Sequence, residues 1–169
     1  MGDQKIMIIS RRDFLGLSGA ALLLSQAACS RTPPPTPIKI DLQADEFINP
    51  NENGDPAPVV VRVYQLKEVT AFEGAEYFDL ADDDKKVLGG DLIGVQEFEL
   101  TPGETKDFNR DVSSEATHIG VIASFRDIDS AQWRDTIELQ QEKKNDFVIY
   151  LTSLAVRIQK LRNRRLGVF

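Results

Sequence analysis

IKIDLQADEFINPNENGDPAPVVVRVYQL, residues 38–66, predicts two β-strands joined by a long loop. In residues 38–42 apolar and polar side chains alternate, and residues 59–66 are mostly β-branched or aromatic, which is typical of strands. Turn-forming residues dominate the segment between them, where three prolines restrict the backbone. The connection is much longer than a hairpin needs, and loops held by a sheet often carry binding sites. We therefore expect residues 47–58 to form a stiff binding loop.

Further strands follow along the chain. Residues 95–100 and 105–112 flank a Pro-Gly turn, and residues 118–125 are apolar almost throughout, as in a central strand covered on both faces. Near the C-terminus the apolar alternation slips by one residue at Thr152-Ser153, which indicates a bulge or a crossing between sheets. These signals predict an all-β fold, a two-sheet β-sandwich of about seven or eight strands, over residues 38–159.

A short helical insertion interrupts the strands after residue 66. Thr70 and Glu73 have the spacing of a capping box. The apolar residues that follow share one helical face, which we expect to close one end of the core: Phe72, Ala75 and Phe78. The contiguous acids of residues 82–84 lack the alternate spacing of a calcium loop, so we expect them to cap a short turn over residues 85–88.

The N-terminus reads as a targeting segment, with a signal peptide over residues 1–28. A charged start precedes a short apolar run over residues 15–24, too short to cross a bilayer, and small residues follow it. Arg11 and Arg12 resemble a twin-arginine export signal, although Gly16 departs from that pattern, so the general secretory route stays open.

Cys29 is the only cysteine, so no intramolecular disulfide can form. Ala27-Ala28-Cys29 resembles a bacterial lipobox, in which the Cys is acylated, although Gln26 stands where Leu is preferred. A multiply acylated Cys would anchor the protein stably in a membrane. Residues 29–37 then form a lipidated, Pro-rich tether with a rise of about 3 Å per residue. The alternative is a chance Cys at the end of an ordinary signal peptide.

The charge distribution argues against nucleic acid as a partner. Residues 30–156 contain 12 Lys and Arg but 25 Asp and Glu, and such an acidic domain repels a phosphate backbone. The basic C-terminal tail, residues 160–169, is too short for a nucleic-acid arm.

The residues of a catalytic centre are missing from the sequence. His118 is the only His and begins an apolar strand, where we expect a structural role. The chain contains no Gly-x-Ser-x-Gly motif and no Gly-rich phosphate loop, and a zinc site has no ligand set to draw on. Trp133, in a polar loop over residues 126–134, is expected to pack over the sheet edge. We predict a binding protein, not an enzyme, with no cofactor and no metal.

Residues 49–66, NPNENGDPAPVVVRVYQL, carry a more specific signal. They resemble the signature of the type VI secretion system outer-membrane lipoprotein family, TssJ, also called SciN or VasD. Matches continue in the family's order through Phe72-Glu73, Phe78 and residues 82–85, 87–89, 102–104, 125–129 and 133–134. The resemblance covers residues 38–158, almost the whole domain that follows the tether.

This resemblance implies a transthyretin-like β-sandwich that is acylated at Cys29 and faces the periplasm from the outer membrane, to which Ser30 directs it. It also implies that the loop over residues 46–58 binds the periplasmic C-terminal domain of the inner-membrane protein TssM, in a complex with TssL. The implied contact residues are Phe47, Ile48, Asn49, Pro50, Asn51, Glu52, Asn53, Gly54 and Asp55.

Two alternatives stay open. Phe47 and Ile48 could pack inward as the end of the first strand, which would leave residues 49–55 exposed. The protein could also be a periplasmic carrier or a carbohydrate-binding lipoprotein, because β-sandwiches serve many functions. A carrier needs a deep apolar pocket, whereas an adaptor needs only an exposed loop.

Overall fold

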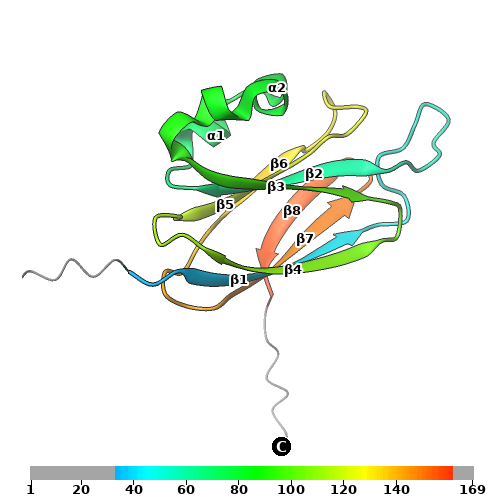
Figure 1. The fold of residues 1–169 in the computed structure, drawn as a ribbon. Coiled ribbons are helices and arrows are strands. Elements are labelled where there is room, and N and C mark those ends of the chain that lie inside the picture. The colour runs from blue at the N-terminus through cyan, green and yellow to red at the C-terminus, as the bar shows by residue number, and fades with distance from the viewer. Residues whose placement is uncertain (1–32, 162–169) are drawn as a thin grey trace, which may run out of the picture. The chain divides into compact units, whose positions relative to one another are not determined.

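The computed structural model describes residues 33–161, which form a sandwich of two four-stranded sheets (Figure 1). The first sheet, in spatial order, contains β4 (Thr105–Val112), β1 (Thr36–Ala44), β7 (Asn145–Thr152) and β8 (Ala155–Lys160). The second contains β3 (Leu92–Leu100), β2 (Val59–Leu66), β5 (His118–Ala123) and β6 (Arg134–Glu138). Among these eight strands, only β1 and β7 pair in parallel. The predicted two-sheet β-sandwich is confirmed, with β1 beginning two residues earlier than expected.

Alternate strand positions supply the core between the sheets. In β1, Ile38, Ile40 and Leu42 are buried, and the residues between them are more exposed. Burying one such side chain stabilises the fold by about 1.5–3 kcal/mol relative to leaving it in water. Because side chains alternate between faces, this pattern fixes which face of each strand turns inward.

A second apolar cluster lies on the outer face of the β2–β5 pair, under the helical insertion. The insertion contains α1 (Thr70–Gly74), α2 (Tyr77–Leu88) and the 3-10 turn η1 (Gly89–Asp91). Phe72 and Leu80 pack there against Tyr64, whose ring centroid is 5.3 Å from that of Phe72. Val121 belongs to the core between the sheets and Ile122 to this outer cluster. The central strand β5 is therefore covered on both faces, as predicted.

The strand pairings place four connections at one end of the sandwich. Antiparallel neighbours and the parallel β1–β7 pair bring together the β1–β2, β3–β4, β5–β6 and β7–β8 connections, as Figure 1 shows. The chain enters β1 and leaves β8 at the other end, where the helical insertion also begins. Within residues 33–161, no helix has the length and apolarity to span a membrane.

The caps of the insertion differ partly from the prediction. Val69, not Thr70, is the N-cap of α1, and no side chain caps it. The Glu73 carboxylate, expected to complete a capping box, instead accepts a hydrogen bond from a hydroxyl of β6 at 3.0 Å. The expected cap among the acids of residues 82–84 is present, because Asp83 leaves helical geometry and its Oδ1 accepts a hydrogen bond from Lys86 N at 3.4 Å.

Phe78 does not share the buried face of Phe72. It is 62% exposed, whereas Phe72 is fully buried. The predicted common face assumed one continuous helix, but α1 ends at Gly74 and Ala75 is extended. The helical phase therefore starts again at α2.

One further strand prediction was wrong, and one strand was missed. The slip at Thr152-Ser153 is neither a bulge nor a crossing, because β7 and β8 are antiparallel neighbours with Thr152 paired to Ala155. A tight turn joins them. β6 was not predicted, and Ile137 is the only apolar residue in it, so its sequence carries little periodic signal.

Candidate binding surface

The β1–β2 loop has a preformed tip. Oδ1 of Asn51 accepts hydrogen bonds from the backbone N–H groups of Asn53 and Asp55, each at 2.9 Å. The backbone N–H of Asn51 donates to Asp55 O, and that of Gly54 donates to Asn51 O, both at 2.9 Å. Gly54 has a φ of 84°, a conformation that other residues rarely adopt. The tip is thus ordered by its own contacts.

Asn49 joins the base of this loop to two neighbouring connections. Its Nδ2 donates to Pro58 O at 2.6 Å, and its Oδ1 accepts a hydrogen bond from the backbone N–H of Arg126 at 2.7 Å. Its own backbone N–H donates to Ser153 O at 2.9 Å. Asn49 is only 2% exposed. One buried side chain therefore fixes the β1–β2 loop against the β5–β6 loop, and its backbone fixes it against the β7–β8 turn.

The nine expected contact residues differ in exposure. Phe47 is 66% exposed, whereas Ile48 is fully buried in the core between the sheets. Inward packing therefore holds for Ile48 and fails for Phe47. Pro50 and Asn51 are half-buried, and the four residues from Glu52 to Asp55 are exposed. The side chains of Ile48 and Asn49, both expected to contact a partner, instead support the loop from inside.

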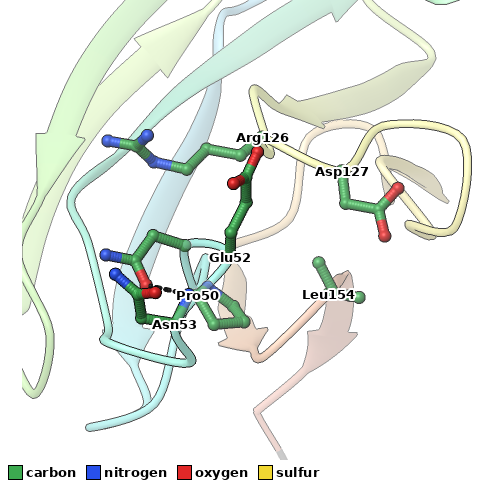
Figure 2. Close-up of a pocket in the computed structure, with 7 residues that line it drawn as sticks. Pro50, Glu52, Asn53, Arg126, Asp127 and Leu154 are labelled. Atoms are coloured by element: carbon green, nitrogen blue, oxygen red, sulfur yellow. Dashed lines mark hydrogen bonds between the residues drawn. The ribbon is translucent and has the colours of Figure 1, made fainter.

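An open depression of about 650 Å³ lies beside the loop tip. Figure 2 shows Pro50 and Glu52 on one side of it, and Asp127 and Leu154 on the other. Its lining comes from the three connections that Asn49 holds together, and the residues are Pro50, Asn51, Glu52, Asn53, Arg126, Asp127 and Leu154. This arrangement offers a mostly polar surface for another molecule.

Arg126, Asp127 and Leu154 were not among the residues expected to form the site. They are separated from the loop by many residues in the sequence, and only strand pairing brings them to the same end. The polar composition of residues 126–134 marked a second loop but did not indicate its neighbour. Asn49 was expected at the surface because the family resemblance implied a partner contact there, and its buried role depends on distant contacts.

The two other residues that the sequence singled out have structural contacts. His118 Nδ1 lies 2.7 Å from Oγ1 of Thr117, a hydroxyl that itself donates to a backbone carbonyl. Trp133 is half-buried beside the edge strand β6, with its ring 5.3 Å from that of Tyr77 and the guanidinium of Arg134 4.7 Å from its centre. Trp133 therefore packs against the sheet edge, as predicted, and His118 is a half-buried strand residue.

Comparison with known families identifies the family of this chain. A family model described as "Type VI secretion lipoprotein, VasD, EvfM, TssJ, VC_A0113" matches residues 36–154. The chain belongs to the type VI secretion lipoprotein family. This family consists of secretion-system lipoproteins and is not an enzyme family. A search of curated proteins gave no match.

Solved structures agree with this assignment. The lipoprotein TssJ1 from Pseudomonas aeruginosa is 36% identical, with a TM-score of 0.74, over 76% of this chain and 98% of that one. The Serratia marcescens protein Lip, a membrane-bound component of the type VI secretion system, is 28% identical, with a TM-score of 0.69, over 76% and 99% of the two chains. A chain of the structure described as the TssM C-terminal domain from EAEC is 27% identical, with a TM-score of 0.61, over 74% and 98%.

For this type VI secretion lipoprotein, several sequence predictions lie outside the described residues. The signal peptide, the export route and the acylation of Cys29 concern residues 1–32, and the basic tail lies almost wholly in residues 162–169. They remain predictions.

Proposed function

We propose that this lipoprotein is anchored in the outer membrane through acylated Cys29 and binds the periplasmic C-terminal domain of TssM through the β1–β2 loop. The observation that carries the proposal is the preformed, exposed loop, whose tip is ordered by Asn51 and whose base is fixed by Asn49. A loop ordered before binding loses little conformational entropy when a partner binds. The similarity to a chain of the TssM C-terminal domain structure supports the choice of partner.

The position of the loop suits a tethered adaptor. β1 has nine residues, so the loop begins about 30 Å from the point where the chain enters the domain. An anchor at Cys29 would hold the entry end near the lipid, and the loop would face away from that attachment. The contact surface would then be free to meet a protein that crosses the periplasm.

The structure gives the carrier alternative no specific support. The depression beside the loop tip is open and is lined mostly by polar side chains of loops. A carrier or lectin of this size needs a concave, largely enclosed site with converging polar groups. We therefore retain the adaptor as the proposed function.

Phe47 provides the sharpest test of this proposal. We would measure the affinity of the full chain, in detergent, for the TssM C-terminal domain. An exposed aromatic residue at the centre of an interface often contributes 2 kcal/mol or more, so we expect Phe47→Ser to weaken binding about 30-fold. Replacing residues 51–55 by Gly and Ser should abolish it.

The matched control is Phe78→Ser, because Phe78 is 62% exposed but lies on α2. We expect this variant to bind like the wild type. If Phe47→Ser and the tip replacement also bind like the wild type, the interface lies on another face. If the wild-type chain does not bind, TssM is not its partner.

A further inference from the structure

The depression beside the loop tip indicates that the partner contacts more than one loop of this protein. We propose that the partner-binding surface extends across this depression to Asp127 and Leu154, and that it accepts a cationic side chain of the partner. This inference rests on the proposed function, because it assigns further residues and a chemistry to the same site. It involves three connections that are distant in the sequence.

The first step is that these three connections form one surface. Asn49 bonds the β5–β6 loop through Arg126 N at 2.7 Å and the β7–β8 turn through Ser153 O at 2.9 Å. The turn is also tied to the strand region before β6, because Gln132 N donates to Leu154 O at 2.8 Å. The depression is therefore lined by backbone held in place from several sides. A partner that binds the loop tip meets the other two connections at the same time.

The second step concerns charge. Glu52 and Asp127 are exposed and contribute to the lining from different connections, and neither makes an ion pair with another residue in the range 33–161. The Arg126 side chain extends away from Asp127 in Figure 2. With Arg126 also in the lining, the depression holds two carboxylates and one guanidinium, and its net negative charge attracts a cation. The acidic character of the whole domain adds to this attraction.

The third step concerns the apolar part of the lining. Pro50 and Leu154 are half-buried and lie on opposite sides of the depression. Long cationic side chains carry an apolar stem and a charged head, so Lys and Arg can contact both kinds of surface. A partner segment with an exposed Lys or Arg therefore fits the depression better than an acidic or purely apolar segment.

Charge-neutralising substitutions test this inference in the same binding assay, with the full chain and the TssM C-terminal domain. We expect Glu52→Gln and Asp127→Asn each to weaken binding about fivefold, mostly through slower association. Asp127→Lys should weaken it more than Asp127→Asn. Asp129→Asn is the matched control, because Asp129 is exposed in the same loop but does not line the depression. It should change the affinity less than twofold.

Circular dichroism would confirm that each variant is folded. If Phe47→Ser weakens binding as expected but Asp127→Asn and Asp127→Lys bind like the wild type, the surface is confined to the β1–β2 loop and this inference fails while the proposed function stands. If Asp129→Asn weakens binding as much as Asp127→Asn, only net charge matters and the depression is not the site. If the wild-type chain does not bind, the proposed function fails and this inference fails with it.

Discussion

Asn49 adopts a left-handed backbone conformation, with a φ of 48°, directly before Pro50. Asn tolerates this conformation better than most residues, and here its side chain also bonds two different connections. A buried amide that makes these bonds cannot be replaced by an apolar residue without leaving Pro58 O and Arg126 N unpaired. Asn49 therefore shapes the candidate binding surface indirectly, because it holds the residues of that surface in position.

Asn49→Gly is expected to destabilise the fold by about 2 kcal/mol, because Gly tolerates the backbone conformation but both side-chain hydrogen bonds are lost. The measurement is urea unfolding followed by circular dichroism. Asn53→Gly is the matched control, since the Asn53 side chain is exposed and only its backbone N–H bonds Asn51. Equal stability of the two variants would contradict the role of Asn49.

At the scale of elements, the helical insertion is held by close packing on the outer face of β2 and β5. Gly120 of β5 lies directly beneath Phe72 of α1. A Cβ at Gly120 would lie 2.8 Å from Cζ of Phe72 and 3.0 Å from Cδ1 of Leu66. The absence of a side chain in β5 thus permits the insertion to approach the sheet.

Gly120→Ala should therefore destabilise the domain by about 1–3 kcal/mol, because the added methyl group overlaps a buried ring. Gly94→Ala in β3 is the control. Its Cβ would be 3.5 Å from the flexible side chain of Gln65, so we expect less than about 0.5 kcal/mol. Thermal unfolding of both variants measures the difference. A larger effect at Gly94 would show that the packing under α1 is not limiting.

The same outer cluster makes stability depend on pH at alkaline values. Burial raises the pKa of Tyr64 from 10.0 to about 12, although the Arg62 guanidinium acts in the opposite direction. Its hydroxyl has no hydrogen-bond partner among the described residues. Below pH 10 the phenol is neutral in both states. Between pH 10 and pH 12 only the unfolded chain loses the proton, so stability falls by about 2 kcal/mol as the pH rises.

Tyr64→Phe should remove this part of the pH dependence, and it should keep or slightly raise stability at pH 7 because an unpartnered buried hydroxyl is lost. The measurement is the free energy of unfolding at several pH values from 9 to 12. Tyr150→Phe, at a residue that is 40% exposed, serves as the control and should leave the slope unchanged. The same slope in Tyr64→Phe and the wild type would assign the alkaline loss to other groups.

At the scale of the whole molecule, the entry of the chain and the candidate binding surface lie at opposite ends of the sandwich. Anchoring and partner binding should therefore be separable by mutation. A binding surface that required contact with the lipid would lie near the start of β1, where the chain enters the domain. The β1–β2 loop lies at the other end of that strand.

Cys29→Ser is expected to move the protein from the membrane fraction to the soluble periplasmic fraction, because an acyl anchor contributes about 0.8 kcal/mol for each buried CH₂ group. Phe47→Ser should remain in the membrane fraction. Cell fractionation followed by immunoblotting distinguishes the two variants. Membrane retention of Cys29→Ser would contradict lipid anchoring through this residue.

Local patterns predicted much of the fold. The strands at residues 38–42 and 59–66 were predicted because alternation and β-branching are properties of neighbouring residues. β6 and the β7–β8 turn were missed because the first is polar and the second resembled a bulge. The location of the β1–β2 loop and its stiffness were predicted from its length and its prolines. The local pattern did not predict that Phe47 is exposed whereas Ile48 and Asn49 are buried.

The sequence by itself determined the two-sheet class, the position of the long loop and the resemblance to type VI secretion lipoproteins, because each depends on residues close together in the chain. Only the tertiary structure decided which loop residues face solvent, and that Arg126, Asp127 and Leu154 join the loop around one depression. The physical reason is that burial depends on which strands pair. Antiparallel pairing, with β1 and β7 parallel, brings together connections that lie far apart in the sequence.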